Sequence, residues 1–388
     1  MSVAFTSIKG VTFYNSRWTY TGLNLLTPVD GEGVWLIDML GKFVHHWHLG
    51  YKPGCDGELL PNGHLLYEGK IKDSPLAYLE GAGGILLELD WDGNLVWKYQ
   101  DPYLHHAFYR MKNGNTLVLK WVEVPTELAI KVKGGHPEAP EKGTMWGDAI
   151  QEITPNGKVV WEWVGYKHLD PEIDVICPLC FRDTWTHANA IVELPDGNIL
   201  TSFMKTNTLA IIDKKTGTIK QRLGSGEFTH QHSPTVLDNG NILVFDNGYH
   251  ELYCPNIMSR VLEINPSSGK IVWSFGGGDE KQLFYSSTMS SCQRLPNENT
   301  FICEGTWGRL FEVNPSGELV WEYVNNLPSY DTSPIKSKSC PVYSAYRYGM
   351  DYSGLKRSVP LPEAKQSAPG AISKEEEALR SRMASLGY

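Results

Sequence analysis

The sequence lacks the features that mark several large classes of protein. No basic run stands out, and the net charge is −9 with a pI near 5.8, so nucleic acid is not expected as a partner. No apolar run reaches the roughly 18 residues of a membrane-spanning helix, so no membrane association is expected. Met1–Asn15 contains neither the charged nor the apolar region of a secretion signal. This predicts a cytoplasmic protein, or a periplasmic one if a signal has been removed.

Cysteine is scarce and irregularly placed. The seven cysteines are an odd number at uneven spacing, which is not a disulfide framework and fits reduced thiols. The one pair with motif spacing is Cys177-Pro178-Leu179-Cys180, which is half of a zinc-binding pattern. His168 is a candidate to complete a structural zinc site with Cys177 and Cys180, and two ordinary loop thiols are the simpler interpretation.

Residues that favour turns and sheets are plentiful instead. The chain contains 38 Gly, 23 Pro and 13 Trp, a composition typical of a turn-rich β protein. A pattern of two apolar segments around a turn, mostly of the Asn-Gly or Asp-Gly type, recurs along the chain and predicts a β-hairpin each time. The copies lie at 58–67, 110–118, 193–200, 236–243 and 294–301.

A second hairpin pattern, which ends in tryptophan, alternates with the first. Its copies lie at 87–97, 151–161, 262–273 and 311–321, and a copy without tryptophan lies at 210–220. One hairpin of each kind makes a four-stranded sheet of about the length of a propeller blade, and five such sheets fill Cys55–Tyr323. A leftover hairpin at Val34–Trp47 and a strand at Pro341–Tyr348 can combine into a sixth sheet.

These repeats predict an all-β fold, a six-bladed β-propeller over residues 1–360. The ring is expected to be closed by N- and C-terminal strands that share one blade, because closure removes exposed sheet edges. The chain becomes polar after Pro360. Residues 361–388 are predicted to form a linker and a short C-terminal helical tail, either solvated or in contact with a second copy in a homodimer.

Side chains at the start of the inner strands are candidates for a site, because equivalent positions around a ring converge on its axis. Four candidates stand eight residues before the turn residue of their repeat. A fifth stands ten residues before it, so a bulge or a longer strand entry is expected there. The four are Cys55, His106, His232 and Ser290, and the fifth is His187; Glu298 takes the turn position that glycine holds in the other repeats.

Motifs spread over about Gly10–Leu355 occur together in a known family. They are Gly22–Leu26, Trp35–Asp38, His187–Ile191, Gln231–Pro234, Phe245–Gly248, Ser259-Arg260 and Arg347–Tyr352. In these motifs the chain resembles the bacterial arylsulfotransferase family. The resemblance implies a six-bladed propeller that transfers a sulfuryl group from a phenolic sulfate ester to a phenol. It also implies that neither a nucleotide donor nor another cofactor takes part.

The resemblance further implies roles for individual residues. His187, His232 and Arg260 match the positions that hold the sulfuryl oxygens, a task that suits their hydrogen-bond donors. Ser286–Gln293, where the family carries its nucleophilic histidine, contains no histidine. The candidates to replace that nucleophile are Ser290, Ser291, Cys292 and His106. The implied catalytic set is His106, His187, His232 and Arg260.

Two other functions fit the same residues. His106, His187 and His232, with His230 or Cys55 as a fourth ligand, could bind zinc, copper, manganese or iron. Such a metal on the propeller axis would support a lyase, a hydrolase or an oxidoreductase. A propeller that binds its ligand without catalysis is the third possibility.

Aromatic side chains near the expected mouth of the axial channel favour a small, anionic, aromatic substrate. The candidates are Tyr109, Trp146, Trp185, Tyr249 and Trp307. Asp246, at the end of a strand, is expected to accept from Arg260 or to orient a histidine. The tryptophans that end the outer hairpins are expected to pack between blades.

Overall fold

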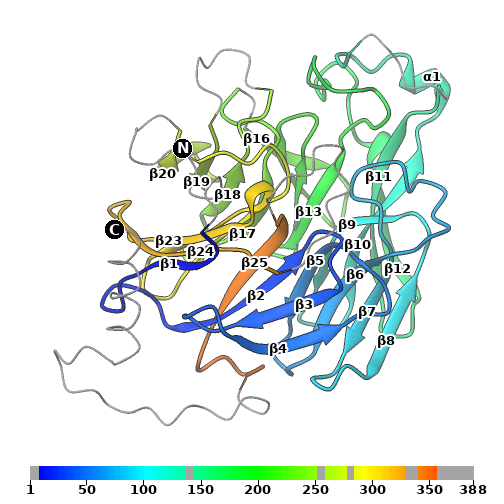
Figure 1. Ribbon diagram of the computed structural model, residues 1–388. Helices are drawn as coiled ribbons and strands as arrows, with labels where there is room; N and C mark the ends of the chain where they lie inside the picture. The colour runs from blue at the N-terminus through cyan, green and yellow to red at the C-terminus, as the bar shows by residue number, and fades with distance from the viewer. Residues whose placement is uncertain are drawn as a thin grey trace.

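Six antiparallel sheets make up the protein, each with its strands ordered outward from a common axis (Figure 1). The computed structural model describes residues 8–136, 143–224, 226–250, 258–277, 284–327 and 340–355. The innermost strands of neighbouring sheets contact one another all the way round the axis. The predicted six-bladed β-propeller is therefore confirmed. The expected linker and helical tail at 361–388 lie outside the described residues.

The strands of each blade follow one another from the axis outward. The first blade consists, in that order, of β25 (Val342–Gly349), β2 (Gly22–Pro28), β3 (Gly33–Ile37) and β4 (Phe43–His48), and the second of β5 (Pro53–Leu59), β6 (Leu65–Lys70), β7 (Gly84–Leu89) and β8 (Leu95–Gln100). The third consists of β9 (Leu104–Arg110), β10 (Thr116–Glu123), β11 (Trp146–Ile153) and β12 (Val159–Val164), and the fourth of β13 (Ala188–Glu193), β14 (Ile199–Phe203), β15 (Thr208–Ile212) and β16 (Ile219–Leu223). The fifth consists of β17 (His232–Val236), β18 (Ile242–Asp246), β19 (Arg260–Asn265) and β20 (Lys270–Gly276), and the sixth of β21 (Ser291–Arg294), β22 (Thr300–Glu304), β23 (Arg309–Val313), β24 (Leu319–Val324) and β1 (Gly10–Tyr14).

Helix is nearly absent from the described part of the chain. The α-helix α1 spans Thr126–Ala129, and two 3-10 turns, η2 and η4, span Gly165–Lys167 and Gly305–Trp307. None of the helical segments in this part has the length and apolar character that spanning a lipid bilayer would require.

The inner hairpins turn where the sequence places their glycines. Gly114 and Gly240 have φ angles of 87° and 82°, a left-handed conformation that glycine adopts without steric cost. Glu298 takes the same position in the sixth blade with a φ of 68°. A residue with a Cβ is strained there. The turn residue thus fixes the phase of each inner strand, and this phase decides which side chains face the axis.

The ring closes as predicted, with β25 from the C-terminal end beside β2 from the N-terminal end (orange beside blue in Figure 1). Their register runs from Gly22 opposite Gly349 to Pro28 opposite Val342. A second contact of the N-terminal segment with the ring was not predicted. The N-terminal strand β1 pairs with β24 and covers the outer edge of the sixth blade.

The outer-strand tryptophans lie between blades, and they also hydrogen-bond across each boundary. In five blades the indole N–H of this tryptophan donates to a carbonyl oxygen in the outer hairpin turn of the next blade. The pairs are Trp47 to Asp90 (3.0 Å), Trp97 to Pro155 (2.7 Å), Trp161 to Lys214 (2.9 Å), Trp273 to Pro315 (3.5 Å) and Trp321 to Met39 (2.9 Å). In the fourth blade, whose repeat lacks the tryptophan, the amide of Gln221 donates to the Pro266 carbonyl. Every blade boundary therefore carries at least one such bond, and the boundary of the third and fourth blades carries a second, from Trp163 to Gly217 (2.8 Å).

Candidate active site on the propeller axis

A cavity of about 820 Å³ lies on the axis and is lined by the inner strands of all six blades. Two sets of lining residues follow from the turn spacing. One set, the histidine layer, stands eight positions before the turn residue and consists of His106, Asn189, His232 and Ser290. The other, the second layer, stands five positions before it and consists of Glu58, Tyr109, Val192, Thr235 and Gln293. Three residues of extended chain separate the two layers by roughly 10 Å.

His106 lies on β9 with a left-handed φ of 54°. Its Nδ1 is 3.0 Å from Nδ1 of His105, so one of the two nitrogens carries the shared proton. Its ring sits against Gly81, where an added Cβ would come 1.9 Å from the His106 Cε1. Burial, and secondarily the charge of His232, lower the pKa of His106 to about 3. The imidazole is therefore neutral at physiological pH.

His232, the first residue of β17, has a tautomer that its neighbours fix. Its Nδ1 is 3.0 Å from the backbone oxygen of His230 and 2.8 Å from Oδ1 of Asn247. The Asn247 amide is oriented by its own donations to the Ser286 and Met289 carbonyls, so both neighbours of Nδ1 are acceptors. Nδ1 therefore carries the hydrogen, and Nε2 on the other ring edge keeps a lone pair. Burial lowers the pKa of His232 to about 4.

His187 lies behind the histidine layer. It precedes β13 with a φ of 50°, and the pairing of β13 with β14 shifts between Ala188 and Ala190. This shift is the expected bulge, and it places Asn189 in the layer position. The His187 ring packs against the His106 ring with centroids 4.7 Å apart, and its Nδ1 is 3.1 Å from Oγ1 of Thr184. Burial and the neighbouring His106 lower the pKa of His187 well below its usual value.

A buried pair supports His106 from behind, and sequence reasoning missed it. His105 stacks on Trp121 with ring centroids 3.6 Å apart. Its Nε2 is 3.3 Å from Oδ1 of Asp148, whose other oxygen accepts from Thr186. Burial raises the pKa of Asp148 to about 6. The two adjacent histidines, one on each face of the strand, were the only signal in the sequence.

Arg260 does not join the histidines. It begins β19, the third strand of its blade, and its guanidinium donates twice to one oxygen of Asp246, at 2.6 and 2.8 Å, and once to the Glu227 carbonyl. It is not among the residues that line the cavity. The expected hydrogen bonds to Asp246 are present, and they direct Arg260 away from the anion-holding position implied by the resemblance.

Of the five predicted aromatic residues, only Tyr109 lines this cavity. Trp185 is fully buried and donates its indole N–H to a backbone carbonyl. Trp146 lies near another aromatic ring at the edge of the third blade, and Trp307 belongs to η4. Tyr249 stacks on a histidine ring 3.9 Å away, outside the cavity.

The second layer and its surroundings are acidic. Burial raises the pKa of Glu58 to about 7. Asp56 also lines the cavity and accepts from Ser344 and Tyr346. Cys55 is buried beside these groups, and burial raises the pKa of its thiol well above the usual value. The thiol form is poorly nucleophilic, so Cys55 does not have the character of a reactive group.

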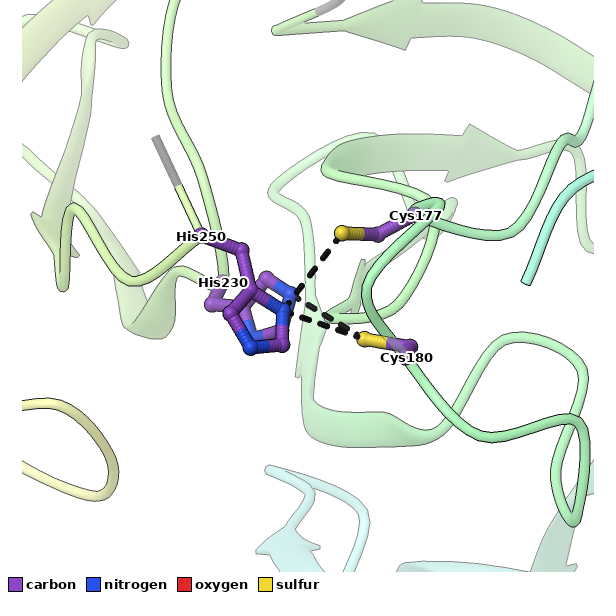
Figure 2. Close-up of side chains that lie close together, drawn as sticks. All are labelled: Cys177, Cys180, His230 and His250. Atoms are coloured by element: carbon purple, nitrogen blue, oxygen red, sulfur yellow. Dashed lines mark hydrogen bonds between the residues drawn. The ribbon is translucent and has the colours of Figure 1, made fainter. Parts of the chain in front are cut away.

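A different set of side chains gathers at the Cys177-Cys180 loop (Figure 2). The group consists of Cys177, Cys180, His230 and His250, whose ligand atoms all lie within 4.8 Å of one another. Within the described ranges, no other group of three or more His, Cys, Asp or Glu meets this distance. The three axial histidines do not form such a group. His230 lies at the cysteines and not on the axis. His168, the expected partner of the cysteines, stacks on a tryptophan ring 5.4 Å away.

Fold and cavity together define the class of protein: a six-bladed β-propeller with a cavity on its axis. Within that class the chain belongs to the arylsulfotransferase (ASST) family, whose model matches residues 58–326. A search of curated proteins finds no match.

Solved structures resemble the chain at low sequence identity. A protein of unknown function from Bacteroides caccae is 15% identical, with a TM-score of 0.55 over 84% of this chain and 98% of that one. A streptogramin B lyase is 11% identical, with a TM-score of 0.45 over 86% of each chain. An inactive variant of virginiamycin B lyase from Staphylococcus aureus, crystallised with quinupristin, is 12% identical, with a TM-score of 0.44 over 81% of this chain and 87% of that one.

Proposed function

We propose that the protein transfers a sulfuryl group from a small aryl sulfate to a phenol at the histidine layer of the axial cavity. Membership of the arylsulfotransferase family supports the reaction class. The observation that carries the proposal is the tautomer of His232. With Nδ1 donating into the wall, Nε2 keeps the lone pair that a nucleophile requires, and His232 lines the cavity.

The first step forms a bond between Nε2 of His232 and sulfur, while the bond from sulfur to the aryl oxygen breaks. The electron pair of that bond leaves with the phenolate. The sulfated imidazole gains positive charge, and the Nδ1–H bonds to the His230 carbonyl and to Asn247 strengthen as it does so.

The second step returns the nucleophile. The acceptor phenol oxygen attacks sulfur, the nitrogen–sulfur bond breaks, and its electron pair returns to Nε2. The neutral imidazole of His106, which belongs to the same layer, accepts a hydrogen bond from the acceptor hydroxyl while the proton of that hydroxyl passes to water, and the phenolate released in the first step takes up a proton from water. Sulfate ester and phenol exchange partners with no further reactant.

The lining of the cavity restricts the substrate. Tyr109 in the second layer offers a ring face for an aryl group. Asp56 and Glu58 also line the cavity, and above about pH 7 the ionised Glu58 would repel a second negative charge on the ring. We therefore expect monoanionic aryl sulfates to be preferred over those that also carry a carboxylate. A volume of about 820 Å³ is in the range of small-molecule sites.

A metal-dependent reaction on the axis is less well supported. Within the described ranges, the one set of side chains spaced for a metal lies at the Cys177-Cys180 loop. His106, His187 and His232 do not form such a set.

The test is sulfuryl transfer from 4-nitrophenyl sulfate to phenol, followed by nitrophenolate absorbance. We expect the wild type to release nitrophenolate and, without acceptor, to gain the mass of one SO3 group in an intact-mass measurement made promptly at neutral pH, because the nitrogen–sulfur bond of a sulfated imidazole hydrolyses in acid. His232→Ala should lose both signals. His48→Ala, which changes an exposed histidine, should keep both. Turnover that is equal in wild type and His232→Ala, or an SO3 group on another residue, would overturn the proposal.

A further inference from the structure

Four side chains from two blades converge at the edge of the fourth and fifth blades (Figure 2). Cys177 and Cys180 lie on the loop that precedes β13, while His230 precedes β17 and His250 follows β18. Cys177, Cys180 and His230 are buried, and His250 is half-buried. Sequence spacing alone indicates only the two cysteines, because the histidines are 50 and 70 residues from Cys180.

The spacing of the four ligand atoms matches a tetrahedron around one ion. Sγ of Cys180 is 3.3 Å from Nε2 of His230, and Nδ1 of His250 is 3.5 Å from Sγ of Cys177 and 3.6 Å from Sγ of Cys180. Zinc bonds of about 2.3 Å to sulfur and about 2.0 Å to nitrogen, at tetrahedral angles, give sulfur–nitrogen separations of roughly 3.5 Å. Nδ1 of His250 is nearly equidistant from both sulfurs, which a single hydrogen bond would not require.

The backbone holds these side chains in place without the ion. The Cys180 amide donates to the Cys177 carbonyl at 2.9 Å, and the Cys177 amide donates to the Lys205 carbonyl at 2.7 Å. His230 and His250 have left-handed φ angles of 54° and 63°, which are costly for residues with side chains. Strain at both histidines of one cluster is typical of a built site.

We propose that Cys177, Cys180, His230 and His250 bind one zinc ion. Two thiolates and two imidazoles at tetrahedral spacing select zinc over magnesium, calcium or manganese, which prefer oxygen ligands. Four protein ligands leave no open position, so the ion is structural and does not activate water. No catalytic role for it is implied.

The ion clamps the loop before β13 to the two loops that flank β17 and β18. His230 is two residues before His232, and its backbone oxygen accepts from Nδ1 of His232. The clamp therefore fixes one of the two acceptors that set the His232 tautomer. His230 is a positioning residue for the axial site, through its backbone, as well as a ligand.

The wild-type protein, expressed with zinc in the medium, tests the proposal without any variant. We expect about one zinc per chain by elemental analysis. The X-ray absorption spectrum should show two sulfur ligands at about 2.3 Å and two nitrogen ligands at about 2.0 Å from the zinc. Cobalt substitution should give thiolate charge-transfer bands. Zinc-free protein, a shell of oxygen and nitrogen only, or a Cys177–Cys180 disulfide would overturn the proposal.

Variants then assign the ligands. Cys180→Ser and His250→Asn should hold zinc at least roughly tenfold more weakly in competition with a chelator. Cys340→Ser and His168→Asn, which alter a cysteine and a histidine outside the cluster, should hold it like wild type. Equal retention in all four variants would contradict the assignment, and loss in the two controls would place the ion elsewhere.

Discussion

Replacing His106 with asparagine should make the free energy of unfolding decrease less as the pH falls. Burial lowers the pKa of His106 to about 3 from its ordinary 6.5. The unfolded chain therefore takes up a proton between these values that the folded protein does not. Stability contributed by the neutral imidazole is present above pH 6.5 and is lost as pH falls toward 3. At about pH 5 the loss is about 2 kcal/mol, from 1.5 pH units at about 1.4 kcal/mol each.

The measurement compares urea unfolding of wild type and His106→Asn at about pH 7.5 and about pH 5. The variant loses the same amount of stability at both pH values because contacts of the imidazole are missing. Between about pH 7.5 and about pH 5, however, its free energy of unfolding should fall by about 2 kcal/mol less than that of the wild type. Other groups titrate in the opposite sense. Burial raises the pKa of Glu58 to about 7 and that of Asp148 to about 6, which stabilises the fold as pH falls. The difference between the two proteins cancels these contributions.

His48→Asn, at an exposed position, should follow the wild-type pH dependence. Parallel pH dependence of wild type and His106→Asn would refute the reasoning, because it would mean that His106 titrates near its ordinary pKa in the folded protein.

Two further substitutions test the packing behind the site and the strain in its scaffold. Gly81→Ala places a Cβ 1.9 Å from the His106 ring and should lower the rate of sulfuryl transfer by on the order of 10²-fold. The control Gly93→Ala has a similar φ but open space around it, and it should not lower the rate. Equal losses in both variants would show that the position of the His106 ring does not matter. Glu298→Gly relieves the left-handed φ of 68° and should raise the free energy of unfolding by roughly 0.5–1 kcal/mol. This value is the backbone strain that is relieved minus the conformational entropy that glycine loses on folding. A urea midpoint below that of the wild type would contradict the prediction.

The sequence located much of the axial site because its turns are regular. Counting back eight residues from the turn residue placed His106, His232 and Ser290 in the cavity. In the second blade the rule failed, because Cys55 is buried and does not line the cavity. Elsewhere it works because each turn fixes the phase of its strand. In the fourth blade the same rule points to Asn189. The sequence-based candidate was His187, two residues earlier, because its side chain can take part in catalysis. The β-bulge that separates them is held by tertiary contacts, including the Met204 amide on the His187 carbonyl.

Partners that come from other blades could not be predicted. His168 was the histidine expected to join Cys177 and Cys180, but the ring brings His230 and His250 to them instead. Repeats also say nothing about loops outside the blades. Arg260 is a different case: its motif position indicates an anion contact, but its side chain forms the ion pair with Asp246 that the sequence also predicted.

The place of β25 in the ring has a consequence for synthesis on the ribosome. β25, the innermost strand of the first blade, is translated more than three hundred residues after β2, so the edge of β2 stays unpaired during that interval. Open edges of this kind recruit other chains. A product that stops short of Val342 would keep that edge, and we expect such fragments to depend on chaperones or to aggregate, however well their five complete blades are made.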